Sequence, residues 1–105
     1  STKLSTLSVH CLDTQSGFPA KNMNIVLQQQ AILVVGRRIG SSDSAGAWET
    51  LAQSSTNADG RVPKDNLPTV PSGIYRVTFD TGSYFTAHQI QDFFFPEATI
   101  TFQIL

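Results

Sequence analysis

The chain has 105 residues, of which 40% are apolar and 14% are charged, and its net charge is −1. This length suits one domain, residues 1–105, and the composition is typical of a folded globular protein rather than a disordered segment. The scattered Lys and Arg residues form no basic stretch for nucleic acid or an anionic membrane surface. No apolar run approaches the roughly 18 residues of a membrane span. Cys11 is the only cysteine, which excludes an intrachain disulfide.

Alternation of apolar and polar residues predicts an all-β chain. In "LSTLSVHCLD", Leu7, Val9 and Cys11 share one face, while Ser8, His10 and Leu12 share the other. Four further segments follow the same two-residue period, and we expect each to form a strand: "MNIVLQQQ", "WETLAQSS", "IYRVTFD" and "EATITFQIL".

The segments between these strands are rich in turn-forming residues. "TQSGFPAK" reads as a turn, and Asn57, Asp59 and Gly60 form a second turn signal. "GRRIGSSDSAGA" reads as a loop, and the preceding "AILVV" either extends the second strand or widens a sheet edge. The segment "TGSYFTAHQIQDFF" is the best helical candidate, and we expect one short helix near Ser83 to Gln91.

Short alternating strands at this spacing favour a sandwich of two antiparallel sheets. The last strand should bury Ala98 and Ile104 and expose Thr99, Thr101 and Gln103. We expect the core shared by the two sheets to contain these side chains: Tyr75, Val77, Phe79, Ile100 and Phe102.

Few residues of the sequence are candidates for catalysis, ligand binding or metal binding. His10 and His88 have no carboxylate or thiol at metal-ligand spacing, so we predict no metal site. His10 is either a surface histidine of the strand or a general base, because imidazole titrates near neutral pH. Arg61 is either a surface residue beside the turn or a set of N–H donors for an anionic or carbonyl-rich ligand. We read His88 as a packing or surface residue, and Cys11 as a small buried apolar residue.

Four blocks of the sequence resemble the transthyretin family, in the same order and over nearly the whole chain. These blocks are "LSVHCLDTQSGFPAKNMNIVL", "WETLAQSSTNADGRV", "GIYRVTFDTGSYF" and "FFPEATITFQI". The histidine before Leu-Asp and the Asp-Gly-Arg turn distinguish the 5-hydroxyisourate hydrolase branch from the thyroid-hormone carriers. His10 and Arg61 match that branch.

The resemblance implies a transthyretin-like sandwich that hydrolyses the cyclic amide 5-hydroxyisourate, a product of urate oxidation in purine catabolism. His10 would activate water, and Arg61 would bind the substrate and stabilise developing charge. The family uses no metal or organic cofactor and is a homotetramer with its active sites in a channel between dimers.

The chain departs from the family pattern in two places. Residues 28–47 form a longer and more apolar connection than the family has. The sequence also stops before the family's last two strands, with their His-x-His segment and Tyr-Arg-Gly-Ser end, so we expect this domain to lack them. Two other functions stay open: a binding module for a small aromatic ligand, and an inactive truncated homologue. "KLSTLSVHC" nearly fits a peroxisomal targeting signal, which leaves cytoplasm and peroxisome as expected locations.

Overall fold

The computed structural model describes residues 3–31, 33–34, 37–38 and 47–105. Within these residues no helix is long and apolar enough to cross a membrane. In the described part of the chain, strands in antiparallel pairs dominate and one short α-helix accompanies them, which confirms the predicted fold class. The elements in chain order are β1 (Leu12–Asp13), β2 (Phe18–Pro19), β3 (Asn24–Gln30), β4 (Leu33–Val34), β5 (Arg37–Arg38), β6 (Trp48–Ser55), the 3-10 helix η1 (Lys64–Asn66), β7 (Gly73–Phe79), α1 (Thr81–Ala87) and β8 (Ala98–Ile104).

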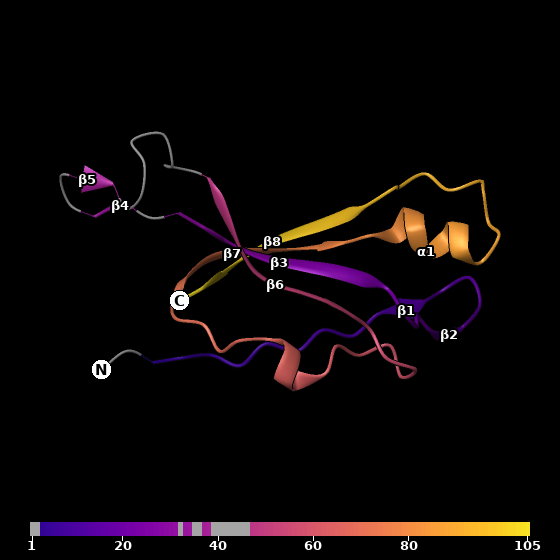
Figure 1. Cartoon of the computed structure of the whole chain (residues 1–105), viewed down its shortest axis with the longest axis horizontal. Coiled ribbons are helices and arrows are strands. Elements are labelled where there is room, and N and C mark those ends of the chain that lie inside the picture. Colours follow the sequence, from indigo (N-terminus) through magenta and orange to yellow (C-terminus); the bar gives the residue numbers. More distant parts are fainter. Residues whose placement is uncertain (1–2, 32, 35–36, 39–46) are drawn as a thin grey trace.

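A four-stranded antiparallel sheet, in the order β6-β3-β7-β8, forms one layer of the molecule (Figure 1). Its register places Leu27 of β3 opposite Val77 of β7, and Val77 opposite Ile100 of β8. The predicted strand "WETLAQSS" is confirmed at both ends, because β6 runs from Trp48 to Ser55. β3 and β7 lie at the centre of the sheet and supply most of its buried side chains.

The two faces of the sheet differ in polarity, as alternation along a strand requires. Ile25, Leu27 and Tyr75 are almost fully buried on the inner face. On the outer face, Arg76 Nε donates a 2.6 Å hydrogen bond to Gln28 Oε1, and its guanidinium carbon lies 4.2 Å from the centre of the Trp48 ring. The inner face therefore builds the core, and the outer face carries a polar network.

Segments 3–11 and 61–72, the second of which contains η1, run along the inner face of this sheet and form the second layer (Figure 1). Two isolated antiparallel bridges join them, Ser5 with Val70 and His10 with Arg61. The predicted alternation from Leu7 to Leu12 is confirmed, since Leu7, Val9 and Cys11 are half-buried while Ser8, His10 and Leu12 are exposed.

The predicted core is correct except at Ala98 and Ile100 of β8. Tyr75 and Val77 are buried, and Phe79 and Phe102 are half-buried against them. Ile100, however, is 58% exposed, so its placement in the core is wrong. Ala98 is exposed as well. Among the described strands β8 is paired only with β7, so it is an edge strand of the sheet. Ala98 and Ile100 therefore have a neighbouring strand on one side only, and their other side is open to solvent.

The helix was expected near Ser83 to Gln91, but it spans Thr81–Ala87. Its start is set by Asp80, whose side chain accepts a hydrogen bond from the Ser83 amide and caps the first turn. Its end follows from Gln89, which takes the left-handed conformation at φ 61° that commonly ends helices.

The connection after β3 does not continue the strand. β3 ends at Gln30, and Leu33–Val34 pairs instead with Arg37–Arg38 as a separate two-stranded unit. Residues 36 and 39–46 of the loop predicted in "GRRIGSSDSAGA" lie outside the described residues.

Candidate functional site

A tight turn leads the chain from β6 to Arg61. Asn57 Oδ1 accepts hydrogen bonds from the amides of Asp59 at 2.9 Å and Arg61 at 3.1 Å. The Gly60 amide closes the turn onto the Asn57 carbonyl at 2.9 Å. Gly60 itself has φ 76°, a conformation that glycine adopts without steric cost. The turn predicted from Asn57, Asp59 and Gly60 is thus present.

This turn docks directly onto the N-terminal segment. The Cys11 amide donates to the Gly60 carbonyl at 2.7 Å, and the Val62 amide donates to the Val9 carbonyl at 3.1 Å. Those two bonds flank the bridge between His10 and Arg61. The two residues therefore form a non-hydrogen-bonded antiparallel pair, in which side chains lie on one face with Cβ atoms about 4.5–5.5 Å apart.

The paired side chains face solvent. His10 and Arg61 are both exposed, and Ser8 lies on the same face as His10. Among the described residues, the Arg61 side chain makes no hydrogen bond or ion pair, so its guanidinium donors are available. An imidazole that can accept a proton thus stands beside a permanent cation with several N–H donors. That combination can activate water next to a bound oxygen atom.

A groove of about 320 Å³ lies between the sheet and the N-terminal segment. His10 and Ser8 are the polar residues of its wall, and Arg61 is not part of it. The remaining lining is apolar: Leu7, Val9, Leu27, Leu67, Val77, Phe79, Ile100 and Phe102. Because an apolar wall leaves polar ligand atoms without partners, the exposed face of the His10–Arg61 pair suits a polar substrate better than the groove does.

A second polar cluster, which the sequence did not reveal, joins α1 to β1 just after His10. The Tyr84 hydroxyl donates a 2.9 Å hydrogen bond to Asp13 Oδ2. Burial, together with this bond and the Asp13 charge, raises the pKa of Tyr84 to about 12. Burial also acts to raise the pKa of Asp13, but the bonds from Tyr84 and from the amides of Ser16 and Gln15 outweigh it and lower that pKa.

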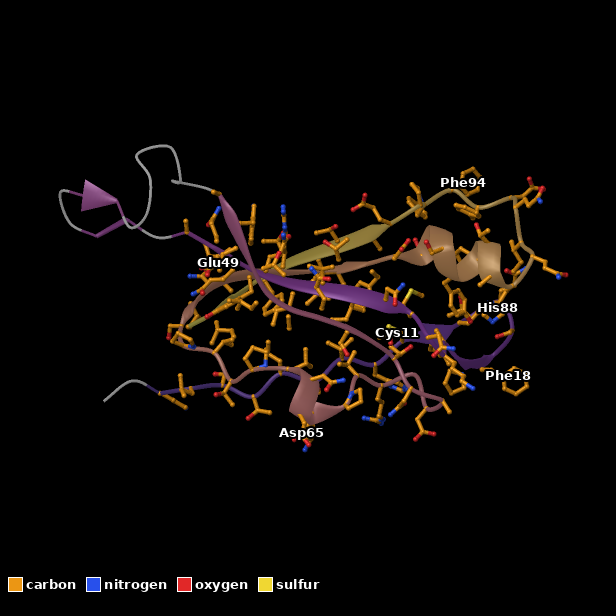
Figure 2. The ribbon with its side chains drawn as sticks, viewed as in Figure 1. Cys11, Phe18, Glu49, Asp65, His88 and Phe94 are labelled. Atoms are coloured by element: carbon orange, nitrogen blue, oxygen red, sulfur yellow. The ribbon has the colours of Figure 1, made fainter. Side chains whose placement is uncertain are left out.

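The contacts of His88 and Cys11 indicate packing roles for both side chains. Figure 2 shows the His88 side chain at the end of α1. The centre of its ring lies 4.3 Å from that of the Tyr84 ring, and its Nδ1 lies 2.9 Å from the Tyr84 carbonyl oxygen. Cys11 packs half-buried against the core, and burial raises the pKa of its thiol, which disfavours a thiolate nucleophile. Within the described ranges, no three His, Cys, Asp or Glu side chains gather as a metal site would require.

Comparison with known proteins gives one consistent similarity. The sequence matches the HIUase/Transthyretin family over residues 7–105. It is 37% identical over 100 residues to 5-hydroxyisourate hydrolase of Salmonella dublin, which covers 93% of this chain but 62% of that protein. The chain therefore spans less than two thirds of the length of this curated relative.

Two solved structures share the fold. The structure of Klebsiella pneumoniae 5-hydroxyisourate hydrolase is similar with a TM-score of 0.71 and 33% identity, over 95% of this chain and 78% of that one. Sea bream transthyretin in complex with thyroxine is similar with a TM-score of 0.69 and 27% identity, over 95% of this chain and 75% of that one.

Proposed function

This chain belongs to the HIUase/transthyretin family, and we propose that it hydrolyses 5-hydroxyisourate in urate degradation, with His10 and Arg61 as the catalytic pair. The observation that carries the proposal is the antiparallel pairing of these two residues on one exposed face. Relatives named 5-hydroxyisourate hydrolase support the choice of substrate.

In the proposed reaction, the His10 imidazole takes a proton from water while the water oxygen bonds to a ring carbonyl carbon of the substrate. The carbonyl oxygen becomes negative, and the N–H donors of Arg61 stabilise it. Collapse of this intermediate breaks the ring C–N bond, and the leaving nitrogen takes the proton from the imidazolium. The products are a ring-opened carboxylic acid and a regenerated imidazole.

Alanine substitution at each position tests this assignment. We expect His10→Ala to slow catalysed decay of 5-hydroxyisourate by about 10²-fold or more, the usual contribution of general-base catalysis. Arg61→Ala should raise KM as well as lower kcat, because the guanidinium binds the substrate before it stabilises the transition state. The decay is followed by absorbance, after subtraction of spontaneous hydrolysis.

Lys64→Ala is the matched control for Arg61, because it removes one positive charge from an exposed residue of the same segment. It should leave both kinetic constants near their wild-type values. His10→Asn keeps a polar side chain that cannot accept a proton, so it should be as slow as His10→Ala. Full activity in both alanine variants would refute the catalytic assignment.

A small-ligand binding module is the second candidate, and the apolar groove beside His10 favours it. Sea bream transthyretin, solved in complex with thyroxine, offers a precedent for binding on this fold. A protein that binds thyroxine but never exceeds the spontaneous rate of 5-hydroxyisourate decay would support this candidate over the hydrolase.

We extend the proposal to a homotetramer. β8 has an unpaired edge among the described strands, its residues 98–104 carry no charge, and Ile100 is 58% exposed. An uncharged, exposed edge strand favours pairing with another chain.

A further inference from the structure

The turn that carries Arg61 is fixed by one side chain, and we propose that Asn57 is a positioning residue for Arg61. This inference rests on the proposed function, because it assigns Asn57 an effect on activity that acts through the guanidinium. Asn57 does not itself need to touch the substrate. Its hydrogen bonds decide where the backbone of Arg61 lies relative to His10.

The backbone of Arg61 is bonded to Asn57 on both sides. The Arg61 amide donates to Asn57 Oδ1 at 3.1 Å, and the Arg61 carbonyl accepts from the Asn57 amide at 2.8 Å. The same Oδ1 also accepts from the Asp59 amide at 2.9 Å. One side-chain oxygen therefore holds two of the amides that define the turn.

Asn57 directly follows a buried residue whose polar groups are hydrogen-bonded. Its neighbour Thr56 is 2% exposed, and the Thr56 hydroxyl donates to the Ala20 carbonyl at 2.5 Å and accepts from the Met23 amide at 2.9 Å. Main-chain bonds from Thr56 to Met23 and from Asn22 to Thr56, both 3.0 Å, complete the anchor. Asn57 thus connects a buried, fully bonded residue to an exposed functional one.

This arrangement matters because Arg61 is exposed and its side chain has no partner among the described residues. A long arginine side chain loses considerable rotamer freedom when it binds a ligand. A fixed backbone leaves that cost unchanged but sets the position from which the side chain extends, and catalytic geometry is sensitive to displacements of about 1 Å. Loss of the Asn57 side-chain oxygen would free the Arg61 amide and let the guanidinium move away from His10.

Three variants of the purified protein test the inference. Asn57→Ala removes the acceptor, and we expect kcat/KM to fall by about 10- to 100-fold, with the larger part in KM if Arg61 binds substrate. Asn57→Asp keeps an oxygen in the same place and suits the same type of turn, so it should restore most of the activity. Asp59→Ala is the control, because it lies in the same turn and its side chain makes no hydrogen bond among the described residues.

A double-mutant cycle separates positioning from general destabilisation. If Asn57 acts through Arg61, adding Asn57→Ala to Arg61→Ala should cause no further loss. Amide hydrogen exchange gives a readout that does not depend on activity. In Asn57→Ala, the amides of Arg61 and Asp59 should exchange faster than in the wild type. In Asp59→Ala, the Arg61 amide should exchange at the wild-type rate. Where the activity of Arg61→Ala is too low for the cycle, the exchange rate of the Arg61 amide decides.

The outcomes distinguish the two proposals. If Arg61→Ala loses activity while Asn57→Ala does not, or if Arg61 amide exchange is unchanged in Asn57→Ala, the positioning role is overturned and the proposed function stands. An equal further loss in the Arg61→Ala background would also overturn it. If Arg61→Ala itself keeps full activity, the proposed role of Arg61 fails and the positioning role fails with it.

Discussion

Replacing Gly60 with alanine tests whether the turn before Arg61 depends on a close approach between two backbone segments. A Cβ added at Gly60 would lie well inside van der Waals contact of the Cys11 carbonyl oxygen, and 3.0 Å from Pro19 Cβ. Gly60 also has φ 76°. Gly17 offers a matched comparison, since it has φ 79° but no atom within 4 Å of an added Cβ.

The structure gives separate estimates for the two substitutions. Gly17→Ala should cost about 1 kcal/mol, the penalty of a left-handed conformation for a residue with a Cβ. Gly60→Ala carries the same penalty and must also move the turn away from Cys11. That movement endangers the bond from Cys11 to Gly60 and the bond from Ala20 to Cys11, at 2.7 and 3.0 Å. At about 1 kcal/mol each, the total for Gly60→Ala is about 3 kcal/mol.

Urea unfolding of both variants measures this difference directly. We expect the free energy of unfolding of Gly60→Ala to lie about 2 kcal/mol below that of Gly17→Ala, with a melting temperature lower by about 8 °C or more. Activity should fall in Gly60→Ala because Arg61 moves relative to His10. Equal destabilisation by the two variants would refute the close contact between Gly60 and Cys11.

Further predictions concern the Asp13–Tyr84 bond and assembly. Tyr84→Phe should destabilise the fold by about 1–3 kcal/mol at neutral pH, since it removes a hydrogen bond to a charged group. The folded pKa of Asp13 is lowered, so the stability that this hydrogen bond contributes is fully present above the unfolded pKa near 4 and is lost as pH falls through the folded pKa. The urea midpoints of wild type and Tyr84→Phe should therefore converge in acid. At alkaline pH, the stability that the Tyr84 hydroxyl contributes is fully present below about pH 10 and is lost as pH rises toward the folded pKa of about 12. A difference between the two urea midpoints that does not change with pH would contradict both statements. Sedimentation velocity at micromolar concentration should show an oligomer, and a monomer alone would contradict the proposed tetramer.

Local pattern was enough to predict much of the sheet. The strand Trp48–Ser55 and the alternating burial from Leu7 to Leu12 follow from side-chain period, which depends only on neighbouring residues. The turn at Asn57 follows from residue types whose side chains bond to their own backbone. The start of α1 was missed because Asp80 caps the helix from the end of a strand, where the strand pattern hid it.

Contacts between distant residues could not be read from these patterns. The sequence determined that Ile100 faces the inner side of its strand, but only the arrangement of strands decided that this side chain stays 58% exposed. The alternation likewise determined that His10 is exposed on an extended segment, and the turn signal determined that Arg61 leaves a turn. Their pairing required the Gly60 turn to dock on Cys11, and the Tyr84–Asp13 bond joins residues 71 positions apart. Alternation and turn chemistry act over a few residues, whereas burial and cross-strand partners depend on which segments the folded chain brings together.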